Sequence, residues 1–344
     1  MPAQIGLDLG TYAVKLVQMS GSGSSLTLEK AAQVPNSVGS IAPVDEREHE
    51  QLVSILDSVF EEAKIQKKQV QIGIPESSVS TKIVAMPSLS DQELASAIPW
   101  QAEQYIPIPA DDLQLEYQVL YRPTKRGTDE PMRVLLVGAA KSFLNRYVSL
   151  FYDAGIDVSK IVTNTFALYS LLMSKKESLP VTLLVNVGAT ATEACVVHNG
   201  EFAFVHTFPT AGTSFSRTIQ QAFDLQPIQA EEYKRSYGLD PAQLEGKMKL
   251  ALEPVFGSFI MELQKVMQYF SGSYKGVQVQ RILVTGGSSM MENFINAIAE
   301  RIPVEVGLLS PTSYIQVGKD CPTVDQNEWP SYSQAIGIAL GKTG

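Results

Sequence analysis

Two stretches of this chain, about 180 residues apart, follow the same order of elements. Residues 5–34 read as an apolar strand, a turn with glycine and a hydroxyl group, a second strand, a glycine turn and a third strand. Residues 181–208 repeat this order, with Asn199-Gly200 as the hairpin turn. A repeated three-strand unit with helices after it predicts two similar α/β domains, and it constrains the fold more than any other feature of the sequence.

The first turn of each unit combines small residues with polar ones. In the first unit Gly10 and Thr11 lie at the tip, with Asp8 in the strand before the tip and Lys15 in the strand after it. Small residues let backbone N–H groups approach phosphate oxygens closely, and a hydroxyl group at the tip can donate to the terminal phosphate. A carboxylate in the strand can hold a hydrated Mg²⁺. Two such hairpins, one from each domain, are therefore predicted to clamp a triphosphate.

The sequence changes character between residues 80 and 160, where proline is frequent. Ser90 is expected to begin a helix, because Glu93 three residues later completes a capping box. The elements expected after this helix are strands at 113–121 and 132–140, a hairpin loop at 125–129 between them, and a helix at 141–154. The segment as a whole is predicted to form a small inserted βαββα subdomain.

Apolar periodicity predicts the elements outside the insert. They are strands at 4–10, 13–20 and 25–34 with a turn at 21–24, a helix at 46–64, a strand at 69–75, helices at 211–223, 228–236 and 244–273, a strand at 281–285, and helices at 291–301 and 331–340. The predicted domains are a first domain of residues 1–79 with 160–180 and the terminal helix 330–344, an inserted subdomain of residues 80–159, and a second domain of residues 181–329.

Composition argues against several classes of protein. The formal net charge of −9 and the isoelectric point near 5.0 argue against a general nucleic-acid surface. Cys195 and Cys321 lie far apart, and nothing in the sequence requires a disulfide, which fits a reducing compartment. No apolar run reaches the roughly 20 residues of a membrane helix, and the N-terminus lacks the pattern of a signal peptide. We therefore expect a cytoplasmic protein with no nucleic-acid partner and no direct membrane insertion.

Four motifs, taken in order, resemble those of the ATP-binding superfamily that includes actin, hexokinase and the heat-shock chaperones. They are DLGTYAVK (8–15), NVGAT (186–190), AEEYK (230–234) and VTGGS (284–288). In that superfamily the first two motifs hold phosphates and the last two hold the nucleoside. The resemblance implies an α/β, actin-like (ribonuclease-H-like) fold with two domains and ATP between them.

The stretch MPSLSDQELASAIPWQAEQYIPIP (86–109) narrows the match. With the proline-rich insert, it resembles the PilM family of actin-like type IV pilus assembly proteins, and the insert lies where the cell-division relative FtsA carries a small subdomain. The resemblance implies a scaffold beneath the inner membrane that serves pilus biogenesis and twitching motility and binds ATP and Mg²⁺. It implies that a groove between the first core subdomain and the insert holds the cytoplasmic N-terminal tail of PilN. The PilN/PilO complex and the pilus motor ATPases are further implied partners.

The same resemblance assigns site residues in this chain. The first phosphate loop comprises Asp8, Gly10, Thr11, Tyr12 and Lys15, with Asp8 holding Mg²⁺ through water. The second phosphate loop comprises Asn186, Gly188, Ala189 and Thr190. The nucleoside contacts are Glu231, Lys234 and Arg235 for the ribose and adenine, Gly286, Gly287 and Ser288 for the nucleoside and α-phosphate, and Gly212 and Thr213 in a further loop near the ribose.

Asn186 departs from the pattern of the superfamily, which usually has aspartate at this position. Asparagine cannot supply the negative charge that helps to hold Mg²⁺ and to orient water. No other residue stands out as a base, because His49, His198 and His206 lie far in sequence from the phosphate turns. We therefore expect ATP binding with at most weak ATPase activity.

Several alternatives remain open at this point. Asn186 can instead satisfy backbone groups at the turn, and Glu231 and Lys234 can form a surface ion pair. Trp100, Tyr105 and Ile106 are expected to form the core of the insert, with the peptide groove as the other interpretation. For the whole protein, the alternatives are a polymer-forming, membrane-associated protein like FtsA and a metabolite kinase of the same superfamily.

Overall fold

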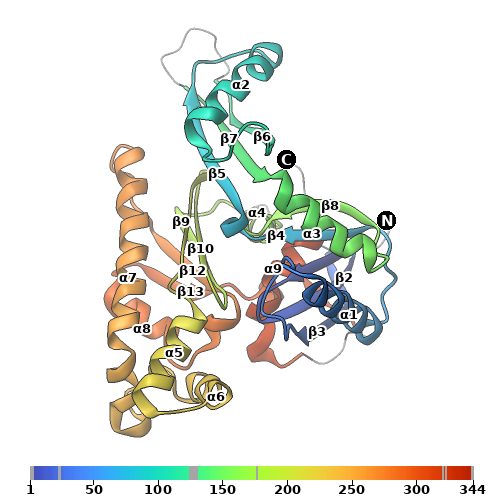
Figure 1. The fold of residues 1–344 in the computed structure, drawn as a ribbon. Coiled ribbons are helices and arrows are strands. Elements are labelled where there is room, and N and C mark those ends of the chain that lie inside the picture. Colours follow the sequence, from blue (N-terminus) through green and yellow to red (C-terminus); the bar gives the residue numbers. More distant parts are fainter. Residues whose placement is uncertain are drawn as a thin grey trace.

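Three β-sheets and the helices that pack on them make up the described part of the molecule (Figure 1). This computed structural model describes residues 4–21, 25–123, 131–175, 177–319, 321 and 324–341. Three of the sequence predictions fall wholly or partly outside the described residues: the turn at 21–24, of which only residue 21 is described, the hairpin loop at 125–129, and the last three residues of the terminal helix 330–344.

The first sheet has six strands within the described residues. They are β1 (Gln4–Leu9), β2 (Ala13–Ser20), β3 (Thr27–Pro35), β4 (Val70–Ile74), β8 (Val158–Thr163) and β14 (Gln316–Val317). Their order is β14-β3-β2-β1-β4-β8. Strands β1, β2 and β3 are antiparallel neighbours, whereas β4 and β8 run parallel to β1. Strand β8 therefore forms one edge of this sheet.

The second sheet repeats the first. Its strands are β9 (Thr182–Val187), β10 (Thr192–His198), β11 (Glu201–Phe208), β12 (Arg281–Thr285) and β13 (Glu305–Leu308), in the order β11-β10-β9-β12-β13. The first three strands are again antiparallel and the last two again parallel to the first. Asn199 and Gly200 both have positive φ in the β10–β11 turn, as an Asn-Gly hairpin requires. The repeat predicted from the sequence is confirmed.

The insert contains the third sheet. Its strands are β5 (Val79–Met86), β6 (Leu113–Tyr121) and β7 (Met132–Ala140), in the order β5-β7-β6, and α2 (Asp91–Tyr105) packs on it. Figure 1 shows this unit at the top, above the two larger sheets. Ser90 and Glu93 form the predicted capping box at the start of α2. Strand β6 forms an edge of this sheet.

The remaining helices surround and separate the two larger sheets. They are α1 (Glu46–Ala63), α3 (Lys141–Asp153), α4 (Asn164–Leu172), α5 (Gly212–Phe223), α6 (Pro227–Tyr237), α7 (Lys247–Ser273), α8 (Phe294–Arg301) and α9 (Trp329–Leu340). One apolar cluster joins α4 and α9 to residues of both sheets, so these two helices lie between the domains. Among the helices of the described residues, none combines the length and the apolarity that crossing a bilayer requires.

Two aromatic side chains that were expected in the core of the insert lie on its surface. Trp100 is 72% exposed and Tyr105 is 47% exposed, whereas Ile106 is buried as expected. The buried face of α2 consists of Leu94, Ile98 and Ala102, which lie four residues apart. Trp100 follows Ile98 by two residues and therefore points away from the sheet. The prediction was wrong for Trp100 and Tyr105.

The predicted limits of the domains remain a proposal, and the packing of α3 and β8 suggests one change to them. Tyr147 and Phe151 of α3 pack with Leu7 and Leu16 of the first sheet, and β8 pairs with β4 of that sheet. Both elements begin before residue 159, where the predicted insert ends. We therefore propose that the insert ends near residue 140 and that α3 belongs to the first domain.

Candidate functional site

A cavity of about 290 Å³ lies between the two larger sheets, where their first hairpins meet. All the residues that the sequence assigned to a nucleotide site line it, from five separate parts of the chain. They are Asp8, Gly10, Thr11, Tyr12, Lys15, Asn186, Gly188, Ala189, Thr190, Gly212, Thr213, Glu231, Lys234, Arg235, Gly286, Gly287 and Ser288. The structure brings them together, and their role in binding a nucleotide stays a prediction.

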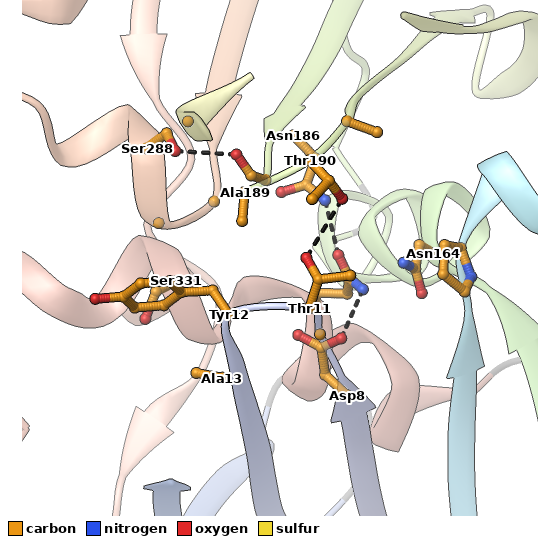
Figure 2. A pocket seen from close by; sticks show the side chains of 18 of the residues that line it. Asp8, Thr11, Tyr12, Ala13, Asn164, Asn186, Ala189, Thr190, Ser288 and Ser331 are labelled. Atoms are coloured by element: carbon orange, nitrogen blue, oxygen red, sulfur yellow. Dashed lines mark hydrogen bonds between the residues drawn. The ribbon is translucent and has the colours of Figure 1, made fainter. Parts of the chain in front are cut away.

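The tips of the two hairpins face each other across this cavity. Each turn is closed by one backbone hydrogen bond, from Gly10 N to Ala13 O at 3.2 Å and from Gly188 N to Ala191 O at 3.1 Å. Figure 2 shows the hydroxyl groups of Thr11 and Thr190 pointing toward one another, and their oxygens are 3.3 Å apart. The small residues at both tips leave backbone N–H groups within reach of an anion.

Each hairpin carries one polar pair across its two strands, at equivalent places. Asp8 pairs with Lys15 in the first hairpin, and Asn186 pairs with Glu193 in the second. Burial raises the pKa of Asp8 above its usual range, although the charge of Lys15 and a hydrogen bond from Gln334 act against this rise. Burial lowers the pKa of Lys15, and the charge of Asp8 opposes that shift. The carboxylate missing at Asn186 is therefore present on the neighbouring strand, as Glu193.

Glu193 lines the cavity and was missed by the sequence analysis. Asn186 donates from Nδ2 to Glu193 Oε2 at 3.0 Å and to Gln334 Oε1 at 2.7 Å, so its partners are side chains and not the turn backbone. Gln334 of α9 in turn donates to Asp8 Oδ1 at 2.9 Å. One signal in the sequence could have identified Glu193, since it is an acid in an otherwise apolar strand, like Asp8. The two acids lie at opposite ends of one hydrogen-bonded chain.

Burial raises the pKa of Glu193 from 4.5 to about 7, and the nearby charge of Glu76 adds to this rise. The folded protein therefore holds this proton more tightly than the unfolded chain. The resulting stabilisation is fully present below about pH 4.5 and is lost as the pH rises through about 7. In the parent protein we expect the unfolding free energy to fall by on the order of 1–3 kcal/mol between pH 5 and pH 8. We expect Glu193→Gln to abolish this fall, because glutamine does not titrate. Denaturant unfolding of both proteins at the two pH values measures the difference, and parallel pH profiles would contradict it.

Lys234 and Glu231 of α6 form an ion pair of 2.6 Å on the other side of the cavity. The interpretation as a surface pair is wrong, because Lys234 is only 4% exposed. Lys234 Nζ also donates to Ser216 Oγ at 3.0 Å and to Gly212 O at 3.3 Å. Burial lowers the pKa of Lys234, while Glu231 acts to raise it. This pair therefore fixes the start of α5 beside the cavity.

Three loops of the second domain interlock beside Gly188. Its carbonyl oxygen accepts from Gly212 N at 3.0 Å and from Ser288 Oγ at 3.0 Å. Thr213 N donates to Ala189 O at 2.8 Å. The second hairpin, the start of α5 and the Gly286–Ser288 turn therefore form one rigid surface of the cavity.

Tyr12 and Arg235 meet at the mouth of the cavity from opposite domains. The guanidinium carbon of Arg235 lies 5.7 Å from the centre of the Tyr12 ring, a distance typical of a cation–π contact. Figure 2 shows the Tyr12 side chain directed away from Asp8 and Thr11. The contact ties the tip of the first hairpin to α6.

The donor set fits ATP with a hydrated Mg²⁺ better than a directly ligated metal. Within the described residues no group of three or more His, Cys, Asp or Glu side chains could hold a metal ion. Asp8 and Glu193 instead lie with the glycine-containing tips of both hairpins around one cavity. Mg²⁺ usually keeps several waters and uses one or two carboxylates together with phosphates.

A second cavity of about 630 Å³ lies between the first sheet and the insert. We call it the groove, and its lining comes mainly from the edge strand β8 and the edge strand β6. The lining residues are Ile74, Val79, Gln114, Glu116, Tyr117, Gln118, Leu135, Val137, Ala139, Leu144, Lys160, Ile161, Val162, Thr163 and Phe166. Within the part of the chain that the structure describes, both strands lie at sheet edges, and such edges with apolar side chains between them can accept an extended peptide.

Comparison with solved structures confirms the fold class. A structure described as a PilM–PilN type IV pilus biogenesis complex superposes with a TM-score of 0.85 at 22% identity, over 98% of this chain and 97% of that chain. The ethanolamine utilization protein EutJ from Carboxydothermus hydrogenoformans gives a TM-score of 0.59 at 15% identity, over 99% and 90%. MreB5 of Spiroplasma citri bound to AMPPNP gives 0.53 at 12% identity, over 98% and 94%. These likenesses show an actin-like, two-domain α/β fold.

Curated proteins with similar sequences include cell division proteins named FtsA. The FtsA cell division protein of Bacillus subtilis (strain 168) is 21% identical over 255 residues, covering 68% of this chain and 58% of FtsA. FtsA of Pseudomonas aeruginosa is 24% identical over 272 residues, covering 70% and 63%. The chain thus spans less than two thirds of the length of these curated relatives.

A family model described as type IV pilus assembly protein PilM matches residues 6–343. Since that match covers almost the whole chain, the protein belongs to the PilM family of type IV pilus assembly proteins.

Proposed function

We propose that this protein is an ATP-binding scaffold of the type IV pilus machine that captures the cytoplasmic N-terminal tail of PilN in the groove. The observation that carries the proposal is the presence of two separate cavities, one between the phosphate hairpins and one between two strand edges. The first suits a nucleotide and the second suits an extended peptide. The family and the solved PilM–PilN complex support PilN as the partner.

The nucleotide half of the proposal is supported by the chemistry of the first cavity. The hairpin tips offer backbone N–H groups to phosphates, and Asp8 offers a carboxylate to the waters of Mg²⁺. In this arrangement the Glu231–Lys234 pair and the Gly286–Ser288 turn hold the nucleoside. The Mg²⁺ would offset charge on the phosphates.

The partner half is supported by the shape and lining of the groove. Strands β6 and β8 lie at the edges of their sheets, so their outer backbone groups are available to an added strand. Tyr117 and Ile161 are partly exposed there, and Lys160 and Glu116 add one charge of each sign. In this proposal the protein lies on the cytoplasmic side of the inner membrane because PilN holds it there. The PilN/PilO complex and the pilus motor ATPases are its further proposed partners.

We expect steady-state ATP hydrolysis close to that of a blank. Asn186 carries no charge, and both carboxylate oxygens of Glu193 already accept hydrogen bonds, Oε1 from Glu76 N at 2.9 Å and Oε2 from Asn186 at 3.0 Å. Neither oxygen is therefore placed to take a proton from an attacking water. A coupled phosphate-release assay measures the rate. Hydrolysis well above the blank that is lost in Asp8→Ala would contradict this prediction.

The partner assignment is tested by calorimetric titration with a synthetic peptide of the PilN N-terminus. We expect one-to-one binding, and we expect Tyr117→Ala to weaken it at least tenfold because Tyr117 lines the groove and is 43% exposed. The matched control is Tyr152→Ala on α3, which removes a 78% exposed tyrosine outside the groove. No binding by the folded protein, or equal weakening by both variants, would overturn the assignment.

A further inference from the structure

A further cavity, of about 330 Å³, lies between the insert and the second domain, and we call it the cleft. Its lining comes from β5 of the insert, from β11 of the second sheet and from the end of α7. Examples are Lys82 and Ile83 of β5, Phe204 and Val205 of β11, and Tyr269 of α7. No described residue of this lining also lines the nucleotide cavity or the groove. The cleft is therefore separate from both proposed binding sites.

Two strand edges border the cleft. Within the described part of the chain, β5 pairs only with β7 and β11 pairs only with β10, so each has one side without a neighbouring strand. On β11 this side is partly covered, because Ala203 O accepts a hydrogen bond from Tyr274 Oη at 3.2 Å. On β5, the backbone of the described residues 80–86 makes backbone hydrogen bonds only to β7. The outer side of β5 can therefore accept an added strand.

Aromatic rings form one wall of the cleft. The ring centres of Phe204 and Tyr269 are 4.8 Å apart, and those of Phe270 and Tyr274 are 4.7 Å apart. Tyr269 is 63% exposed although its ring packs on Phe204. A tyrosine in such a place offers an apolar ring and a hydroxyl group to a partner, which is why this residue is frequent at interfaces. The wall can therefore receive an apolar side chain.

The lining of the cleft is positively charged, although the whole chain has a formal net charge of −9. Among the described residues, the lining contains Lys82 and Arg133 and no Asp or Glu. Arg133 donates to Glu201 Oε2 at 2.6 Å, and its guanidinium carbon lies 5.9 Å from the centre of the Tyr274 ring. Lys82 is exposed, and the ion pairs that the described lysines form do not include it. Since Glu201 balances Arg133, the charge of Lys82 is the unbalanced one.

We propose that the cleft is a second peptide-binding site, which holds an extended acidic segment of a partner protein along β5. An acidic side chain of the segment pairs with Lys82, and an apolar side chain packs on Tyr269. The volume of the cleft lies at the lower end of the range of about 300–1,000 Å³ for ligand pockets, so it admits a few side chains and not a folded domain. Charge complementarity selects an acidic segment over a basic one. The inference goes beyond the proposed function and depends on neither ATP nor PilN.

The probe is a phage-displayed library of random dodecapeptides, selected on the immobilised parent protein. The enriched peptides are then synthesised, and their affinity is measured by fluorescence anisotropy. We expect peptides with a net negative charge and at least one large apolar side chain. We also expect their affinity to fall as the salt concentration rises, because salt screens a solvent-exposed ion pair such as the one with Lys82.

Two variants test the proposed contacts. We expect Lys82→Glu to weaken peptide binding at least tenfold, because it places like charges together, and Tyr269→Ala to weaken it at least fivefold, because it removes the exposed ring. The matched controls are Lys68→Glu, the same charge reversal at another exposed lysine, and Tyr152→Ala, which removes a 78% exposed tyrosine. Neither control residue lines the cleft, and we expect both controls to bind within twofold of the parent.

Several results would overturn the proposal. They are the enrichment of no peptide, the enrichment only of peptides whose binding depends on the groove residue Tyr117, and an unchanged affinity in Lys82→Glu or in Tyr269→Ala. Sedimentation velocity of the parent tests another occupant, since self-association that Lys82→Glu abolishes would assign the cleft to a second copy of the chain and would also overturn the proposal. A failure of nucleotide or PilN binding would refute the proposed function and leave this inference standing.

Discussion

Replacing Gly286 with alanine is expected to lower nucleotide affinity at least 100-fold. Gly286 has φ of 91° and ψ of 165°, a region that almost only glycine adopts, at a cost of about 1–3 kcal/mol for other residues. A Cβ atom there would also lie 2.6 Å from Val187 O, in the strand that leads to the second phosphate hairpin. The Gly286–Ser288 turn would have to move away from the hairpin, and the rigid surface beside Gly188 would be lost. Titration with a fluorescent ATP analogue measures the change.

The control for this variant is Gly287→Ala in the same turn. A Cβ atom on Gly287 meets no described atom within 4 Å, so the added methyl group requires no backbone shift. We expect Gly287→Ala to keep the stability of the parent and to lose less than tenfold in affinity. Equal losses of nucleotide affinity in both variants would mean that any methyl group added to this turn blocks binding. The explanation from backbone geometry would then be wrong.

Replacing Gly6 with alanine is expected to lower the unfolding free energy by about 3 kcal/mol or to prevent folding. Gly6 lies in the middle of β1, where the backbone of α9 crosses it. A Cβ atom on Gly6 would lie 2.5 Å from Ala339 N and would also overlap Ala335 O. Because α9 packs against both sheets, it cannot move away without opening the apolar cluster between the domains. Denaturant unfolding monitored by circular dichroism measures the loss.

The control for Gly6 is Gly257→Ala in the interior of α7. A Cβ atom on Gly257 meets no described atom within 4 Å, and alanine favours helix over glycine by about 1 kcal/mol. We therefore expect the control to be as stable as the parent or slightly more stable. Parent-like stability of Gly6→Ala would show that α9 can shift, and would contradict the tight β1–α9 contact.

Much of the fold could be predicted from the sequence because its signals are local. Alternating apolar residues and turn residues gave the three-strand units, and the sheets follow the same order twice. The packing of α3 was not predictable in this way, because an amphipathic helix does not indicate which sheet it covers. Its buried residues Tyr147, Leu150 and Phe151 join the core of the first sheet. The aromatic residues of α2 were assigned by type and not by helical position, which explains the error at Trp100.

The candidate site was predictable where its residues lie in short motifs. Asp8 and Thr11 belong to one hairpin, so their short spacing in the sequence placed them together. Glu193 could not be predicted from the motif, because the motif indicates an acid at the position of Asn186 and Glu193 lies on the strand beside it. Gln334 bridges Asp8 and Asn186 from α9, more than 140 residues from the nearer of the two, so only the tertiary structure reveals it.

The two strand edges beside the groove have a consequence for the protein in the cell. Open edges such as those of β6 and β8 pair readily with any extended chain, including another copy of the same protein. A PilN tail bound in the groove would cover the strand edges at which self-association begins. A cell that makes more of this protein than of its proposed partner would therefore accumulate copies with unprotected edges. Balanced synthesis of the two proteins would thus be a condition for solubility as well as for assembly.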